Sequence, residues 1–268
     1  MPPAPGLKGV CERCGAPAQA KCGSIVRWHW AHAGRRHCDP WMENEGPWHK
    51  ACKKLFPFEW REVIAHDHKG EKHVADVRRP DGVVIELQNS PMSIEEMQSR
   101  EAFYGQRMIW IVNAERFRNH ISIGAALPVP KHPQLEEYQL ALPIFGPNAA
   151  QLWLGYFRRA DLEARTSTHD LVELFHGREF EALEGSHRGH HAWSWKRPRE
   201  VWLHARRTVF LDFGAGGCLW ALVNYQGHTG RAIYPVVRER FMHAALSGAQ
   251  FSFDQPPRAI AVPIAPRV

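Results

Sequence analysis

The chain has 268 residues, 44% hydrophobic and 23% charged, and this composition excludes a wholly disordered protein. The length suits one large domain or two ordinary ones, and 21 glycines and 20 prolines without a period exclude a collagen-like chain. No run of about 18 apolar residues and no signal-peptide pattern occurs, so we expect a cytoplasmic protein. The net charge of +6 weakly favours a polyanionic partner such as nucleic acid.

Cysteines and histidines are concentrated near the N-terminus, where five of the six cysteines lie in the first 52 residues. Residues 1–45 have too little apolar periodicity to form a core alone, which favours a zinc-finger-like segment held together by a metal. The spacing of Cys11-x-x-Cys14 and His29-x-x-His32 is close to that of structural Cys2His2 sites. We therefore predict that these four residues bind Zn²⁺. The competing ligands are Cys22, His37 and Cys38.

The next segment predicts a helix, a three-stranded meander, a second helix and a fourth strand. Gly46 and Pro47 open the first helix, and Ser93 with Glu96 forms a capping box that opens the second. A continuous apolar run then indicates a strand covered on both faces. The expected elements are helices at 47–56 and 94–105 and strands at 58–65, 72–78, 83–88 and 108–112. The apolar side expected for the first helix consists of Trp48, Cys52, Leu55 and Phe56.

The turn between the second and third strands determines how two acidic residues face each other. If residues 80–82 form a three-residue hairpin loop with a left-handed glycine, paired positions sum to 162. Asp76 then lies opposite Glu86, with Cβ atoms about 4.5–5.5 Å apart. Gln88 projects from the same face. A two-residue loop would instead place the two carboxylates on opposite faces.

Facing like charges destabilise a hairpin unless a cation neutralises them. A divalent ion with oxygen ligands is the economical candidate, and Mg²⁺ or Mn²⁺ could polarise a phosphoryl oxygen and lower the pKa of bound water. This chemistry is phosphodiester hydrolysis. A solvated acidic hairpin is the alternative, but the surrounding residues predict interior strands, where unpaired charges are costly. These neighbours are Val74, Val77, Val83, Val84, Ile85 and Leu87.

Several motifs between residues 11 and 112 have the order and spacing of a known family. In order they are Cys11-x-x-Cys14, His29-Trp30-Ala31-His32, Glu45 with His49 and Lys53, Asp76 with Glu86-Leu87-Gln88, Ser90, and Arg100 with Tyr104 before Ile109-Trp110-Ile111. This stretch, under half of the chain, resembles the CoiA-like competence proteins. The HxAH element and the E-x-Q strand followed by serine are the most specific parts. The resemblance implies a PD-(D/E)XK nuclease, with a restriction-endonuclease-like core in the element order given above.

The resemblance also implies roles for the acidic residues. Asp76 and Glu86 would hold the catalytic metal, and Glu45 could reach the same ion or activate water. Gln88 stands where the wider fold usually has lysine. Because glutamine only forms hydrogen bonds and carries no positive charge, this departure bears on activity.

Two pairs of helical residues are further candidates for the site. His49 and Lys53 lie four residues apart, so they share a helix face and could contact phosphate or support a carboxylate. We predict His49 as catalytic and Lys53 as a DNA contact. Arg100, also predicted to contact DNA, has the same spacing to Tyr104; the alternative is a helix face that packs against the sheet.

The remainder of the chain contributes a second candidate surface. Prolines make residues 116–150 a predicted linker or excursion, and residues 151–268 are expected to form an α+β module. Between residues 187 and 207, six basic residues stand against one acid with tryptophans interleaved, which is typical of a nucleic-acid surface and also of solvated charge over buried rings. The predicted DNA contacts there are Trp195, Lys196, Arg197 and Arg199.

Two hypotheses follow for the whole chain. In the first, the chain is an α/β protein with a zinc segment (1–45), a nuclease core (46–115) and a C-terminal module. It acts as a metal-dependent deoxyribonuclease in DNA uptake, recombination or defence, with DNA-processing proteins as further partners. In the second, the nuclease-like core is inactive and the chain is a zinc-containing DNA-binding module. Gln88 is the feature that most favours the second hypothesis.

Overall fold

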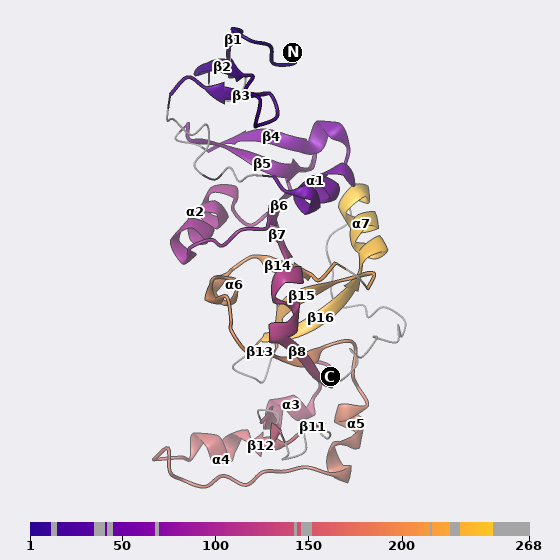
Figure 1. The fold of residues 1–268 in the computed structure, drawn as a ribbon. Coiled ribbons are helices and arrows are strands. Elements are labelled where there is room, and N and C mark those ends of the chain that lie inside the picture. The colour runs from indigo at the N-terminus through magenta and orange to yellow at the C-terminus, as the bar shows by residue number, and fades with distance from the viewer. Residues whose placement is uncertain are drawn as a thin grey trace. The chain divides into compact units, whose positions relative to one another are not determined.

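The computed structural model shows a mixed α/β protein with a large mixed sheet and several helices (Figure 1). It divides into two compact units, Met1–Glu86 and Leu87–Val268. The described residues are 1–11, 15–34, 41, 45–67, 70–141, 144–145, 152–214, 216–225 and 231–248. Among them, no helix combines the length and the apolar character that a membrane crossing requires.

The first unit begins with a small antiparallel sheet in the order β1-β2-β3. Its strands are β1 (Lys8–Val10), β2 (Pro17–Lys21) and β3 (His29–His32). Cys11, just after β1, is hydrogen-bonded to the residues just before β2: its carbonyl accepts from the Gly15 amide and its amide donates to the Ala16 carbonyl, both at 2.8 Å. Little of this sheet is buried, since Ala18 is the one core residue among its described positions. Its strands therefore depend on something other than a hydrophobic core.

The rest of the first unit has the predicted order of a helix followed by an antiparallel meander. Pro47 starts the helix as its first residue, as its fixed φ favours. The elements are α1 (Pro47–Lys54), the 3-10 turn η1 (Phe58–Trp60), β4 (Arg61–His66), β5 (Lys72–Arg78) and β6 (Val84–Gln88), whose last two residues belong to the second unit. In β5, His73, Ala75 and Val77 are buried, whereas Asp76 lies on the other, partly exposed face. This alternation is the period of two expected for a strand.

The β5–β6 hairpin has the predicted register. Gly82 adopts a left-handed φ of +86°, and its amide donates to the Arg79 carbonyl at 2.9 Å. The Arg79 amide in turn donates to the Val83 carbonyl at 2.9 Å, which closes the loop. The paired residues are Val77 with Ile85 and Arg78 with Val84. Each pair sums to 162, as expected for the three-residue loop.

The second unit contains six strands of the sheet in the order β7-β14-β15-β16-β13-β8, of which only β7 and β14 are parallel neighbours among the described pairs. The strands are β7 (Met108–Asn113), β8 (Ile121–Ala126), β13 (His191–Trp195), β14 (Thr208–Asp212), β15 (Cys218–Asn224) and β16 (Arg231–Val237). Two small pairs join β9 (Tyr138–Leu140) to β12 (Tyr156–Arg158) and β10 (Ile144–Phe145) to β11 (Leu152–Trp153). The helices are α2 (Ile94–Tyr104), η2 (Glu115–His120), α3 (Gln134–Glu137), α4 (Arg159–Glu163), η3 (Arg178–Phe180), α5 (Glu181–Glu184), α6 (Glu200–His204) and α7 (Arg238–Ser247).

The predicted linker is therefore only partly irregular. Residues 121–126 form β8, an edge strand that pairs with β13. The prolines that motivated the linker begin at residue 128, after this strand ends. The edge position agrees with the expectation that no central strand lies in this segment.

Candidate metal centre

Asp76 and Glu86 come from neighbouring strands of the first unit and lie close together. Continuing the β5–β6 register by one residue places them opposite each other. The backbone amide of Asp76 donates to Glu86 Oε1 at 3.2 Å. Glu86 is 3% exposed and lies in a strand whose five residues are all buried, so its carboxylate is held in the interior.

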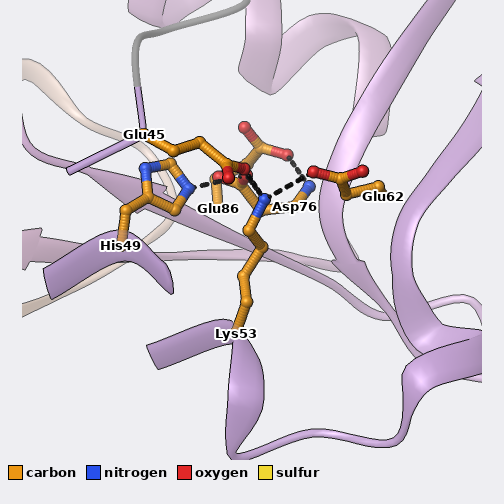
Figure 2. A network of polar contacts seen from close by, with 6 residues as sticks. All are labelled: Glu45, His49, Lys53, Glu62, Asp76 and Glu86. Atoms are coloured by element: carbon orange, nitrogen blue, oxygen red, sulfur yellow. Dashed lines mark hydrogen bonds and ion pairs between the residues drawn. The ribbon is translucent and has the colours of Figure 1, made fainter. Parts of the chain in front are cut away.

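Helix α1 adds an imidazole and an ammonium to these carboxylates (Figure 2). His49 Nε2 lies 2.8 Å from Asp76 Oδ1. Lys53 Nζ lies 3.8 Å from the same oxygen and 2.8 Å from Glu62 Oε1, and it also forms an ion pair with Glu45. The two helical side chains are only 5% and 8% exposed. They share one helix face, as their spacing predicted.

The inward face of α1 is therefore more polar than expected. Of the apolar side that we predicted, Cys52 and Phe56 are buried, whereas Leu55 is 48% exposed. The buried residues of the helix are His49, Cys52 and Lys53. The apolar pattern was incomplete, because His49 and Lys53 also turn inward to contact Asp76 on β5.

Glu45, His49 and Asp76 form the one group of three described residues whose potential ligand atoms all lie close together, within 4.8 Å of one another. An octahedral ion with ligands at about 2.1 Å separates neighbouring ligand atoms by about 3 Å and opposite ones by about 4 Å. The group therefore has the dimensions of a metal site. Two carboxylates and an imidazole suit Mn²⁺ better than Mg²⁺, which prefers oxygen ligands alone. Glu86 lies beside this group, next to the Asp76 amide.

The charge of the cluster also favours a divalent cation. Figure 2 shows four carboxylates, those of Glu45, Glu62, Asp76 and Glu86, around the one ammonium of Lys53, a formal charge of −3 with His49 neutral. Carboxylates taken out of water are costly unless cations balance them. A divalent ion would leave a formal charge of −1.

Glu62 is a member of this cluster that the sequence did not reveal. Its φ of +53° is the one left-handed φ among the described residues other than glycine. This conformation costs a residue with a side chain about 1–2 kcal/mol. In the β4–β5 register, residue 62 would lie opposite Asp76, because Arg61 pairs with Val77 and Val63 with Ala75. Only that register would have pointed to Glu62.

Two other predicted site residues lie in the second unit. Gln88 is 1% exposed, and its Nε2 donates to the Ser90 carbonyl at 3.1 Å. Arg100, predicted as a DNA contact, is 4% exposed and forms an ion pair with Glu96 at 2.5 Å on the same helix. The predicted DNA contact Lys53 is likewise buried, at 6% exposed. Arg100 and Lys53 are therefore both buried rather than exposed for contact with DNA.

The structure separates the two histidines of the predicted zinc site. Cys11 follows β1, and His32 pairs with Ala18 near that end of the sheet. His29 lies at the other end of β3, about 10 Å away along an extended strand and on the opposite face. His29 is therefore placed away from Cys11 and His32, because the HxAH element is a strand rather than a turn. Cys14, His37 and Cys38 lie outside the described residues.

In the second unit, the predicted basic surface retains exposed cations. Lys196 and Arg197 are exposed, whereas Arg199 and Trp195 are partly buried. The ring of Trp195 stacks on that of Phe117, with centroids 5.0 Å apart. Trp195 is therefore engaged in internal packing.

No protein-family model, no curated protein and no solved structure matches this chain. The chemistry of the centre therefore provides the basis for assigning a function.

Proposed function

We propose that the chain is a divalent-metal-dependent DNA nuclease with a CoiA-like, restriction-endonuclease-like core. The observation that carries this proposal is the group of Glu45, His49 and Asp76, which sits beside an ammonium in a cluster of formal charge −3. The order α1, β4, β5, β6, α2, β7 supports the proposed core. A bound ion would supply a Lewis acid for a phosphoryl oxygen and a water of lowered pKa.

Three side chains of the cluster would bind the ion, and Lys53 with Glu62 would act on the phosphate. Glu45 and Asp76, at 29% and 18% exposed, present oxygens on the accessible side of the cluster, and His49 supplies the third ligand. Lys53 would stabilise the negative charge that develops on phosphate, the role that lysine plays in place of Gln88 elsewhere in the fold. Glu62 would orient this ammonium through its 2.8 Å contact.

A cleavage assay tests the proposal directly. Purified protein would be incubated with single-stranded, double-stranded and branched DNA, with Mn²⁺ or Mg²⁺ and with a chelator. We expect cleavage that requires the ion and that Asp76→Ala or Glu45→Gln lowers by more than about 100-fold, since even supporting residues of metal sites are worth about 10–100-fold. Glu59→Gln, which removes an exposed carboxylate on η1, is the control. Normal cleavage by both site variants would refute the assignment.

The second candidate is a DNA-binding module in which the cluster only fastens α1 to the meander. The observation that favours it is Lys53, which already contacts three carboxylates and so supplies part of the compensating charge. In that case no divalent ion would bind, and DNA would be bound without being cut. Binding of Mn²⁺ measured by calorimetry, lost in Asp76→Ala, would decide against this candidate.

A further inference from the structure

The second unit joins two basic segments that lie about 80 residues apart in the sequence. The turn η2 leads directly into β8, whose first residue, Ile121, pairs with Trp195 at the end of β13. The Lys196 amide donates to the His120 carbonyl at 2.8 Å, so the pairing continues past the strands. Residues 115–120 and 196–199 therefore leave the same end of this strand pair, which is labelled in Figure 1.

Phe117 fixes the two segments to each other. Its ring is 4% exposed and stacks on Trp195 with an interplanar angle of 19°. The guanidinium carbon of Arg199 lies 4.8 Å from the centre of the same ring, within the range of a cation–π interaction. Both contacts cross between η2 and the segment after β13, so the cations that these segments carry have fixed relative positions.

These segments form a basic surface, which we call the η2–β13 surface. Its cations are Arg116, Arg118, Lys196, Arg197 and Arg199, and the acids beside them are Glu115 and Glu200. All of these cations except Arg199 are exposed. Burial, and then the nearby charge of Arg116 in η2, lower the pKa of Arg199, so these two cations from different segments lie near each other. Such crowding favours a bound polyanion.

We propose that the η2–β13 surface binds the phosphate backbone of a nucleic acid. Arginine predominates, and its planar guanidinium matches phosphate oxygens in a bidentate geometry. The aromatic ring of Trp195 packs on Phe117, so contacts to phosphate rather than base stacking would supply the affinity. The choice of nucleic acid over other polyanions rests on the proposed nuclease function. The surface would hold the substrate through its backbone, without preference for sequence.

A binding experiment with neutralised pairs tests this surface. Affinity for fluorescently labelled single-stranded and duplex oligonucleotides would be measured by anisotropy without divalent ions, in the wild-type chain and in Asp76→Ala. The variants are Arg116→Gln with Arg197→Gln and, separately, Arg118→Gln with Lys196→Gln; each pair takes one cation from each segment. The control pair is Lys131→Gln with Arg178→Gln, exposed cations outside both segments. Thermal melts of every variant check folding.

We expect each surface pair to weaken binding at least tenfold at 150 mM salt, whereas the control pair changes it less than twofold. The slope of log affinity against log salt should fall by about 0.9 per phosphate contact removed on duplex DNA and by about 0.7 on single strands. Binding within twofold of the control pair would overturn the proposal, as would binding to phosphatidylserine vesicles without binding to oligonucleotides. Cleavage by the wild type with unchanged binding by the surface variants refutes this surface alone. Surface-dependent binding without any cleavage refutes the nuclease alone.

Discussion

Replacing Lys53 with methionine tests whether the carboxylate cluster is built for a second cation. Methionine keeps the apolar stem but removes the ammonium that contacts Glu45, Glu62 and Asp76. With four carboxylates and no ammonium, the formal charge changes from −3 to −4. We expect the variant to be less stable without divalent ions and to bind Mn²⁺ more tightly, because the competing positive charge is gone.

The expected loss in the free energy of unfolding follows from how far the ion pairs are buried. Removing one partner of a buried ion pair costs about 3–5 kcal/mol. Lys53 is 8% exposed, but Glu62 is 40% exposed and Glu45 29%, so solvent screens part of the interaction. We therefore expect a loss of about 2–3 kcal/mol. At about 2–4 °C per kcal/mol, Tm would fall by roughly 4–12 °C. An ion at one hundred times its Kd returns about 2.7 kcal/mol, enough to offset the loss.

The assay is a thermal melt of wild type and Lys53→Met, each with chelator and with a series of Mn²⁺ concentrations. Lys54→Met is the matched control, because Lys54 is exposed on the same helix. The expected result is a larger rise in Tm with Mn²⁺ for Lys53→Met than for either of the other proteins. If Mn²⁺ raises the Tm of neither wild type nor Lys53→Met, the cluster is not a cation site; if it raises both equally, Lys53 does not compete with the ion. If the variant melts with wild type in chelator, the ion pairs contribute no stability.

Two further predictions concern other parts of the chain. His32→Ala should lower the zinc content measured by atomic emission and His29→Ala should not, because the two side chains lie at opposite ends and faces of β3; equal losses would contradict this. Burial, and then the neighbouring charge of His187, lower the pKa of His191. The neutral imidazole therefore stabilises the folded protein above the ordinary histidine pKa of about 6.5, and this stability is lost as pH falls. Urea unfolding should give a lower free energy at pH 5.5 than at pH 7.5, and the difference should shrink in His191→Asn; an unchanged difference would count against this assignment.

The parts of the fold that depend on neighbouring residues could be predicted from the sequence. The hairpin register follows from a three-residue loop with Gly82 in the left-handed region, and the observed pairs confirm it. The start of α2 at Ser93 is also confirmed, since Ser93 Oγ caps the helix by accepting from the Glu96 amide at 3.1 Å. Each of these features spans only a few residues and has few alternatives.

Features that require contacts between distant segments could not be predicted in the same way. The pairing of β8 with β13 joins residue 121 to residue 195, and no local pattern specifies that partner. The inward face of α1 depends on what β5 presents to it, so the apolar residues of the helix, of which Cys52 and Phe56 are buried, did not reveal that His49 and Lys53 are buried as well. Glu62 enters the centre only through the β4–β5 register, which the sequence left undetermined.

Three residues of the centre have properties that usually destabilise a fold, and all three lie in the same cluster. Glu86 is a carboxylate in a fully buried strand, Lys53 is a buried ammonium, and Glu62 takes a left-handed φ. A cluster built only to fasten α1 to the meander would need none of these features, because apolar side chains of similar volume usually stabilise as well or better. Local violations that converge from separate elements are expected at functional sites. These three come from different strands and a helix, so a common role at this point would explain all of them, and the divalent cation that we propose would supply that role.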